Sequence, residues 1–289
     1  MSTRGPAAEL VLRWGLPRLR DLPWRNTRDP WGVLVSEVML QQTQVARVLT
    51  RWPQFLERFP TPAACAAAPL ADVLREWQGL GYPRRARNLH AAASMVTAAG
   101  AFPNDLAGLL ALPGVGPYTA RAVLAFAYEA DVAVVDTNIA RIYARLAGRP
   151  LRAAEVQAHA DAHVPRGSGW AWNQCLMDLG ALVCRPTPDC AACPLASVCS
   201  WRGRPDLPDP AVGSAGVSST QPRFAGSDRE ARGRLLRALT AGAVRRTDAA
   251  TVMGRDPATA ERLIVTLTAD RLVEASAAWL WLPGEPQPR

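Results

Sequence analysis

The chain has 289 residues, enough for one large domain or for two to three smaller ones. Hydrophobic residues make up 49% and charged residues 20%, so the chain is too apolar to be fully disordered. Lys+Arg number 33 against 25 Asp+Glu, and the formal net charge of +8 favours a polyanionic partner such as nucleic acid. A GC-rich genome, which raises the arginine content of all its proteins, is the alternative explanation of this excess.

Other features exclude whole classes of protein. No uninterrupted apolar run reaches the roughly 20 residues that a membrane-spanning helix needs. Residues 1–15 include Glu9 and Arg13 and lack an apolar signal core, so we expect a cytoplasmic protein. All 33 basic residues are arginine, and without lysine no side chain can form a Schiff base with a carbonyl substrate.

Residues 30–59 are predicted to form one helix. Their apolar residues share one stripe at helical period: Leu34, Val38, Val45, Val48, Leu49 and Trp52. Gln41 falls inside this stripe, and Glu37 lies on its edge close to Gln44. Polar groups on an apolar face cost free energy unless they are satisfied or used. A functional carboxylate and a buried polar network that fixes helix packing explain Glu37 equally well.

Eight further helices are predicted, separated by glycine and proline turns. They span residues 62–68, 70–77, 83–99, 104–111, 117–129, 136–147, 153–164 and 170–181. Alternation at period two is almost absent through residue 203, so the main body is predicted to be all-α.

The C-terminal part differs in composition. Residues 204–226 are rich in Pro, Gly, Ser and Ala and are predicted to be a flexible linker. Residues 227–289 are predicted to form a small module. Its elements would be a helix over 228–241 capped by Ser227 or Asp228, a short helix capped by Thr247 and Asp248, a helix from Asp256-Pro257, and a hairpin of 272–274 with 278–282. This order is typical of a winged-helix domain, although many small modules share it.

Four of the six cysteines follow the pattern C-x5-C-x2-C-x5-C. They are Cys184, Cys190, Cys193 and Cys199. In a chain without a signal peptide, such a cluster indicates metal binding rather than disulfides. Zinc sites usually combine two pairs of cysteines, each pair separated by two to four residues, whereas here only Cys190 and Cys193 form such a pair. The longer spacings between the other cysteines suit a [4Fe–4S] cluster. An iron–sulfur cluster is therefore our first interpretation, zinc the second and free thiols the third.

Residues 112–120 join two predicted helices through a glycine hairpin. Gly114 and Gly116 let the backbone turn sharply and approach a ligand closely. The amides that open the next helix are suited to a phosphate. Two glycines between helices are usually only a turn, but the full Leu-Pro-Gly-Val-Gly-x-x-Thr-Ala string favours a helix–hairpin–helix motif, which binds a DNA strand through backbone amides.

Asp136 follows an apolar run, residues 132–135, and precedes the helix that carries Asn138. The common use of Asp at such a junction is to cap the helix N-terminus. The same carboxylate can also face a cleft. Glu37 and Asp136 are therefore a candidate carboxylate pair from distant parts of the chain.

Taken together, these motifs resemble the adenine DNA glycosylases, which remove adenine mispaired with guanine or 8-oxoguanine. The motifs are Ser36–Gln44, Gly79–Tyr82, the hairpin, Val135–Asn138 and the four-cysteine loop. The family belongs to the helix–hairpin–helix superfamily, alongside endonuclease III, and the resemblance covers roughly residues 20–203. It implies a six-helix barrel over 30–135 and an iron–sulfur subdomain made of 1–29 and 136–203, with the active site in the groove between them.

The resemblance also implies catalytic roles. Glu37 matches the general acid that protonates adenine at N7, and Asp136 matches the carboxylate that stabilises an oxocarbenium-like sugar. Burial beside apolar neighbours would raise the pKa of Glu37 above its ordinary value of about 4.3. Tyr118 stands where bifunctional members of the superfamily carry a catalytic lysine, so we expect an enzyme that leaves the abasic site uncut. Asn138 matches a residue that positions the catalytic water or Asp136.

Adenine must leave the helix before this chemistry, so base flipping is implied. The expected DNA contacts are Gln42, Tyr82, Gly114, Gly116, Thr119 and Arg25. Gln42 and Tyr82 match positions that wedge into the duplex, and Arg25 is a candidate contact near the adenine pocket. The clustered cysteines would hold a [4Fe–4S] cluster. The expected partner is double-stranded DNA with A:8-oxoguanine or A:G mispairs, bound by a monomer in the nucleoid and away from membranes.

Two other functions remain open. A thymine or uracil mismatch glycosylase of the same superfamily would share the hairpin, the tyrosine and the cluster, but releasing a pyrimidine does not need the N7 protonation assigned to Glu37. A DNA damage-binding protein without catalysis would not need both carboxylates. Residues 227–289 are too few for the domain similar to a nucleotide hydrolase with which the family commonly recognises 8-oxoguanine.

Overall fold

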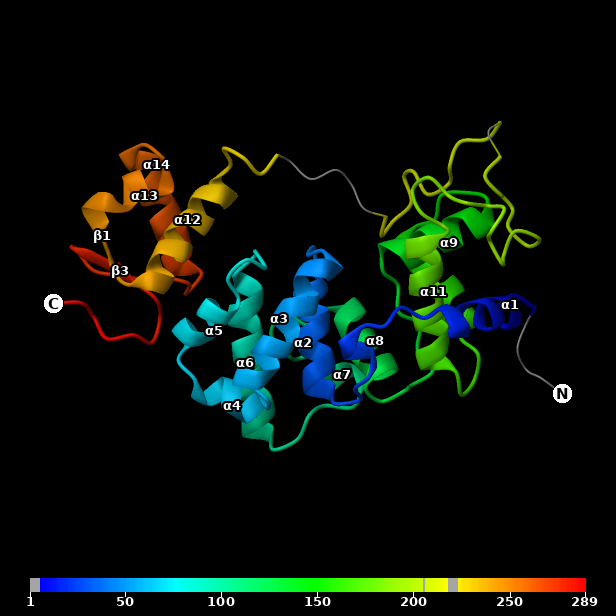
Figure 1. The fold of residues 1–289 in the computed structure, drawn as a ribbon, viewed down its shortest axis with the longest axis horizontal. Coiled ribbons are helices and arrows are strands. Elements are labelled where there is room, and N and C mark those ends of the chain that lie inside the picture. Colours follow the sequence, from blue (N-terminus) through cyan, green and yellow to red (C-terminus); the bar gives the residue numbers. More distant parts are fainter. Residues whose placement is uncertain (1–5, 205, 218–222) are drawn as a thin grey trace. The chain divides into compact units, whose positions relative to one another are not determined.

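The computed structural model describes residues 6–204, 206–217 and 223–289, and these residues are mostly helical (Figure 1). Up to residue 204 the described residues contain no strand, which confirms the expected all-α main body. None of the helices in the described ranges is both long enough and apolar enough to cross a bilayer. The chain divides into two compact units, each built from segments that are distant in sequence.

The first unit comprises the described residues of Met1–Val33, Asn104–Leu110 and Val115–Thr220. Its elements are α1 (Pro6–Gly15), the 3-10 turns Leu16–Arg18 and Pro23–Arg25, the start of α2 (Pro30–Leu40), α7 (Leu106–Leu110), α8 (Pro117–Phe126), α9 (Thr137–Ala147), α10 (Ala153–His163) and α11 (Gly169–Leu182). The core forms where α1 and α9 pack against α11 (Figure 1). A Cβ at Gly15 would lie only 2.5 Å from Cys175 Sγ, so this glycine allows α1 to approach α11 closely.

The second unit comprises Leu34–Pro103, Ala111–Gly114 and the described residues of Gln221–Arg289. Its helices are the rest of α2, α3 (Val45–Arg58), α4 (Pro62–Ala67), α5 (Leu70–Glu76), α6 (Arg84–Ala99), α12 (Asp228–Ala241), α13 (Ala249–Met253) and α14 (Pro257–Ala269). Helix α6 packs against α4 and α5. The buried Phe55 and Trp77 meet edge to face, with ring centroids 5.9 Å apart, and connect α3 to the end of α5.

The predicted continuous helix over 30–59 is wrong. The chain leaves the helix at Gln41 and re-enters it at Val45, and Gln42 has a positive φ of 56°. The break changes the phase of the apolar stripe, so Val48 is buried as expected while Leu49 is 38% exposed. The break contains no Gly or Pro, so periodicity alone does not detect it. The eight helices predicted after it are confirmed, whereas α1 is not among the predicted elements.

The C-terminal module, residues 227–289, contains the three predicted helices. Ser227 accepts a hydrogen bond from Glu230 N at the start of α12, and Asp256 accepts one from Thr259 N at the start of α14, as their capping roles predict. The side chain of Asp248 makes no capping bond to α13. The predicted hairpin is present as β2 (Glu274–Ala275) and β3 (Trp279–Trp281).

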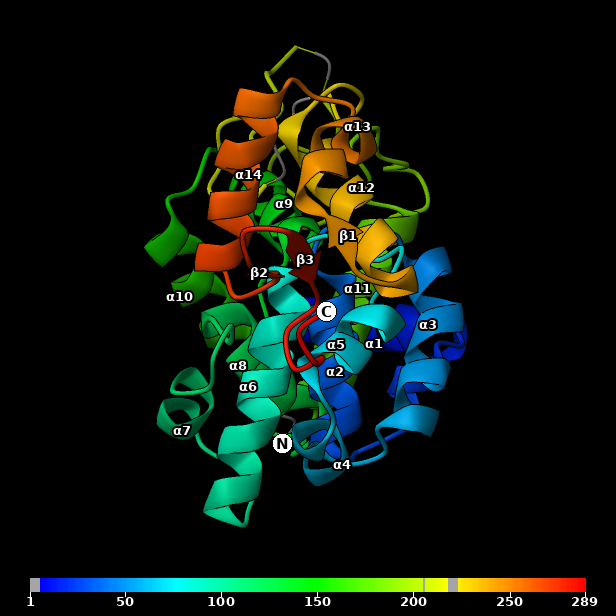
Figure 2. The same ribbon diagram turned by 90° about the vertical axis from the view of Figure 1, so that its left-hand side faces the viewer.

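A third strand, β1 (Val244–Arg245), was not predicted. It pairs antiparallel with the other side of β3, so the sheet order is β1-β3-β2 (Figure 2). A 3-10 turn, Arg246–Asp248, follows it. Two residues are too few to give a period-two pattern, and this explains why the sequence does not reveal β1.

Part of the segment predicted to be a flexible linker is packed within the first unit. Asp209 pairs with the buried Arg145 (Nη2 to Oδ2, 2.6 Å), and the Ser214 hydroxyl accepts a hydrogen bond from Leu151 N at 3.0 Å. Ala211 is buried. Residues 205 and 218–222 of the predicted linker, and residues 1–5 of the predicted N-terminal segment, lie outside the described residues.

Candidate active site and thiol pocket

Glu37 lies in α2, where every residue from Trp31 to Met39 is buried, and its own exposure is 5%. The helix begins at Pro30, and the Asp29 carboxylate accepts hydrogen bonds from the backbone N–H groups of Trp31 and Gly32 in its first turn. The sequence thus places a carboxyl group inside one of the most apolar helices of the chain. Such burial costs free energy, so it favours a paired or functional group over an incidental one.

Asp136 is the N-cap of α9, as predicted. Its Oδ1 accepts a hydrogen bond from Ile139 N at 2.7 Å, and its Oδ2 accepts one from Asn138 Nδ2 at 2.9 Å. Burial raises the pKa of the Asp136 carboxyl, while these hydrogen bonds and the nearby Arg141 oppose the rise. Asp136 is half-buried, and the N–H groups of Ile139 and Asn138 hold its carboxylate in one orientation.

Arg141 extends this arrangement, and the sequence assigns it no role. Its Nη2 donates to Asn138 Oδ1 at 2.7 Å, which fixes the amide so that Nδ2 faces Asp136. The same nitrogen donates to Gly180 O at 2.8 Å, and Nε donates to Cys184 O at 2.7 Å. A Cβ at Gly180 would lie 2.5 Å from that of Asn138, so glycine is needed where α11 meets α9. The only sequence signal of the contact between Arg141 and Asn138 is that Arg141 follows Asn138 by three residues on the same helix face.

The hairpin between α7 and α8 is present as predicted. Gly114 has a φ of +78°, and a Cβ there would lie 2.7 Å from Asn88 Cβ, so only glycine fits. Gly116 has an ordinary φ of −95°, and a Cβ would meet no atom within 4 Å, so its backbone is open to an approaching ligand. Tyr118 is half-buried in the first turn of α8, whereas Thr119 is buried. Contact of Thr119 with DNA remains a prediction.

Arg25 is buried, and its guanidinium is engaged inside the first unit. Nη1 and Nη2 each donate to the Asp178 carboxylate at 2.8 Å, and Arg20 donates to it through its backbone N (2.9 Å) and Nε (2.7 Å). Burial pushes the pKa of Asp178 upward, but these donors outweigh burial and hold the pKa below its ordinary value. The contact of Arg25 with the adenine pocket remains a prediction, and its observed partner is Asp178.

Gln42 and Tyr82 share an unusual backbone conformation. Their φ values are +56° and +48°, in the left-handed region that residues other than glycine seldom adopt. Both are exposed, Tyr82 by 37%. Each such conformation costs on the order of 1–3 kcal/mol and often marks a functional site. The resemblance alone predicts a role for these residues, and their backbone geometry is an independent observation.

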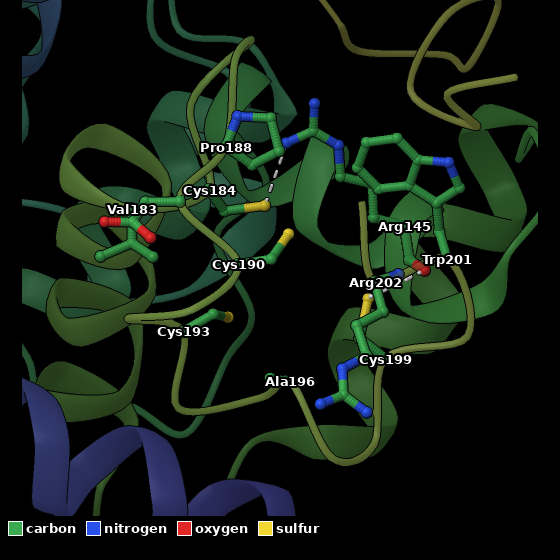
Figure 3. A pocket seen from close by; sticks show the side chains of 11 residues that line it. Arg145, Val183, Cys184, Pro188, Cys190, Cys193, Ala196, Cys199, Trp201 and Arg202 are labelled. Atoms are coloured by element: carbon green, nitrogen blue, oxygen red, sulfur yellow. Dashed lines mark hydrogen bonds between the residues drawn. The ribbon is translucent and has the colours of Figure 1, made fainter. Parts of the chain in front are cut away.

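The four clustered cysteines, Cys184, Cys190, Cys193 and Cys199, line one pocket (Figure 3). Arg145 Nη1 donates to Cys184 Sγ and Arg202 N donates to Cys199 Sγ, both at 3.3 Å. A Cβ at Gly203 would lie 2.8 Å from Cys190 Sγ, so the backbone encloses the pocket closely. Burial raises the pKa of Cys193 to about 11, which makes it a poor nucleophile when it is a free thiol.

No three His, Cys, Asp or Glu side chains within the described ranges are grouped as one metal ion requires. The four cysteines nevertheless line one pocket, and the sulfur atoms of Cys184 and Cys199 accept hydrogen bonds from N–H donors. N–H to sulfur bonds stabilise thiolates, and four thiolates around one pocket suit a positively charged group larger than a single ion.

The helical fold and the helix–hairpin–helix define a class of base excision DNA repair proteins. Residues 35–166 match the family model described as the HhH-GPD superfamily base excision DNA repair protein. Two solved structures share the fold, each covering 68% of this chain. One is a thermostable thymine-DNA glycosylase (TM-score 0.63, 28% identity, 95% of that chain), and the other is a non-covalent endonuclease III–DNA complex (TM-score 0.60, 25% identity, 94% of that chain).

Sequence comparison identifies the family within this class. The chain is 43% identical over 291 residues to an adenine DNA glycosylase of Mycobacterium tuberculosis (strain CDC 1551 / Oshkosh), covering 95% of this chain and 93% of the relative. It is 42% identical to that of Mycolicibacterium smegmatis (strain ATCC 700084 / mc(2)155), with 92% of both chains covered. The Homo sapiens adenine DNA glycosylase is 37% identical over 212 residues, which cover 67% of this chain and 39% of the relative. The chain therefore belongs to the adenine DNA glycosylase family and is an enzyme of the hydrolase class, which confirms the resemblance inferred from its motifs.

Proposed function

We propose that this enzyme binds double-stranded DNA and hydrolyses the N-glycosidic bond of adenine mispaired with 8-oxoguanine or guanine, leaving the strand uncut. The observation that carries the proposal is the Asp136 carboxylate, which two N–H donors hold at the start of α9. A carboxylate fixed in this way suits the stabilisation of a positively charged sugar. The identity of 43% with a curated adenine DNA glycosylase supports adenine as the base.

The reaction needs one protonated and one ionised carboxyl group. Glu37, buried among the apolar residues of α2, would be the acid that gives its proton to adenine N7. Asp136 would be ionised and would face the sugar as the bond to adenine breaks. Asn138 would keep Asp136 oriented, through the bond from its Nδ2 to Asp136 Oδ2, while water adds to the sugar carbon.

The absence of lysine supports a monofunctional reaction. Cutting the strand after base removal needs an amine that forms a Schiff base with the sugar aldehyde, and no side chain of this sequence supplies one. Tyr118, at the start of α8, would donate a hydrogen bond near the reacting groups instead of attacking the sugar. The product would be an intact strand with an abasic site.

Binding would open the duplex and turn adenine into the site. Gln42 and Tyr82 would insert beside the mispair, and their exposure supports this role. The hairpin residues Gly114, Gly116 and Thr119 would hold a phosphate through backbone amides, for which the open backbone at Gly116 has room.

We also propose that Cys184, Cys190, Cys193 and Cys199 hold a [4Fe–4S] cluster. The shared pocket and the N–H donors from Arg145 and Arg202 support this assignment. The bound cluster would tie together the loop that follows α11. Freshly purified protein should be brown and contain about four irons per chain. Stoichiometric zinc instead would overturn the assignment.

The other predictions of the sequence analysis remain proposals. They are a six-helix barrel over 30–135, a cluster subdomain of 1–29 with 136–203, a linker over 204–226, a winged-helix-like module over 227–289, and a cytoplasmic, nucleoid-associated monomer. The three helices and the three-stranded sheet of the C-terminal module support the winged-helix interpretation.

The test is single-turnover base release from duplexes that carry A:8-oxoguanine, A:G, T:G or U:G, with and without alkali. We expect adenine release that becomes a strand break only after alkali and that is lost in Glu37→Gln and Asp136→Asn. A strand break without alkali would contradict the monofunctional reaction. Full activity in either variant would contradict the corresponding catalytic role.

The second candidate is a thymine or uracil mismatch glycosylase, because a solved thymine-DNA glycosylase shares the fold over 68% of this chain. Release of thymine or uracil alone from the T:G or U:G duplexes would establish it. Binding without release from any duplex would instead indicate a damage-binding protein.

A further inference from the structure

Arg85, in the first turn of α6, connects two loops that are about forty residues apart in sequence. Its Nη1 donates to three carbonyl oxygens around the end of α2: Val38 (2.7 Å), Met39 (3.0 Å) and Gln41 (2.6 Å). Its Nη2 donates to Thr43 Oγ1 (3.0 Å), Leu80 O (2.9 Å) and Gly81 O (3.1 Å). One side chain thus holds the turn between α2 and α3 and the turn between α5 and α6.

Each of the two turns carries one of the strained residues. Gln42 lies between two acceptors of Arg85, the Gln41 carbonyl and the Thr43 hydroxyl. Tyr82 follows the Gly81 acceptor, and its own carbonyl accepts a hydrogen bond from Arg85 N at 2.9 Å. A left-handed residue persists only where its surroundings hold it there. The contacts of Arg85 on either side of Gln42 and Tyr82 provide such surroundings.

Within the described ranges, the guanidinium of Arg85 forms no ion pair with a carboxylate, and its buried Nε has no hydrogen-bond acceptor. The Cζ atom of Arg85 lies over the rings of Trp77 and Tyr82, 5.5 and 5.4 Å from their centroids. Burial lowers the pKa of Arg85 to about 10, so the group remains charged at neutral pH. Lysine could not make these contacts. It carries a single ammonium group, whereas the planar guanidinium of Arg85 directs donors toward both turns.

We infer that Arg85 is a positioning residue that couples the two turns, so that Gln42 and Tyr82 enter the duplex as one rigid wedge. The inference rests on the proposed function, because that function gives the two side chains their role in opening DNA. It goes beyond that function by naming the residue that sets their relative position.

The test compares Arg85→Met with Arg58→Met. Both variants remove one positive charge from the second unit, but Arg58 is exposed at the end of α3 and pairs with Asp72 and Glu76 rather than with either turn. Duplex opening is followed by the fluorescence of 2-aminopurine placed next to the target adenine, and adenine release by single-turnover kinetics. We expect both rates to fall about a hundredfold in Arg85→Met, as for a misplaced group, and to stay at the wild-type level in Arg58→Met.

A second duplex separates wedge positioning from a general defect. In this duplex the target adenine stands opposite an abasic site and is already poorly stacked, so little wedging is needed. The loss in Arg85→Met should shrink at least about tenfold, because the barrier that depends on the wedge is lower. An equal loss on both duplexes would overturn the inference.

Arg85→Lys keeps the charge and the aliphatic stem and serves as the second variant if Arg85→Met does not fold. It should open the mispaired duplex more slowly than the wild type, with circular dichroism unchanged. Opening at the wild-type rate would overturn the inference. If the wild-type enzyme releases no adenine, the proposed function fails, while the 2-aminopurine signal still tests Arg85 by itself.

Discussion

The Asp178 carboxylate is completely buried and accepts hydrogen bonds from both Arg20 and Arg25. Its pKa in the folded protein is held below its ordinary value, which is about 3.9 in the unfolded chain. The group therefore stabilises the fold fully above about pH 4, and this stabilisation is lost as the pH falls through the folded-state pKa. Arg25 thus contributes to stability whether or not it also contacts DNA.

We predict that Arg25→Met lowers the free energy of unfolding by about 3–5 kcal/mol at neutral pH, because it leaves a buried carboxylate with one charged partner. Urea titration followed by circular dichroism measures the change. The control is Arg13→Met, which removes an exposed pair with Glu9 and should cost less than about 0.5 kcal/mol. Equal effects of the two substitutions would show that Arg25 is not a structural anchor.

A second prediction concerns the pH dependence of the reaction. If Asp136 must be ionised, the rate falls as the pH drops through its pKa, which burial already raises. Asn138→Ala removes the donor to Oδ2 and raises that pKa further, so the acidic limb of the single-turnover rate should move to higher pH. Gln157→Ala, which removes a surface contact with Asp161, is the control and should leave the limb in place. An unchanged limb in Asn138→Ala would show that this amide does not stabilise the ionised carboxylate.

At the scale of elements, most local signals in the sequence are reliable, although Asp248 makes no capping bond to α13, whereas contacts between distant segments are not predicted. Ser227, Asp256 and Asp136 cap helices as predicted, because a cap depends only on residues within one turn. The break at Gln42 was missed, because it depends on contacts with Arg85, which lies far along the chain. Arg141 was missed as a partner of Asn138 for a related reason, since its other acceptors lie on and after α11.

The hairpin offers a matched pair of substitutions. Gly114→Ala places a methyl group against Asn88 at a positive φ, so we predict a loss of roughly 1–3 kcal/mol in stability. Gly116→Ala meets no atom of the protein and should leave stability nearly unchanged, but it should weaken DNA binding where a phosphate approaches the backbone. Thermal unfolding and fluorescence anisotropy with labelled duplex measure the two effects. Normal DNA affinity in Gly116→Ala would argue against a phosphate at this position.

Within the second unit, the C-terminal module is bound to α5 and α6 by charged contacts that no local pattern predicts. The Asp270 carboxylate accepts hydrogen bonds from Arg84 at 2.7 Å and from Arg232 at 2.5 Å, and its carbonyl accepts one from Arg87. Arg75 of α5 pairs with Glu285. The module is therefore anchored next to the turn that carries Tyr82.

We predict that Asp270→Ala loosens this contact without unfolding the module. Backbone amides of residues 79–89 and of the module should exchange faster with deuterium, because local opening becomes easier. The control is Glu261→Gln, which weakens a pair with Arg246 inside the module and should not affect residues 79–89. Unchanged exchange in Asp270→Ala would show that the carboxylate does not hold the two parts together.

The bond between Asp178 and Arg20 closes a loop of 158 residues, and this has a consequence for synthesis of the chain. Translation at about 5–20 residues per second separates the two partners by about 8–30 s. During that time α1 and the Arg20–Arg25 segment have no α11 to pack against. The beginning of the chain must therefore remain without its final partners while the α3–α6 region leaves the ribosome, and a chaperone has its longest opportunity to bind there.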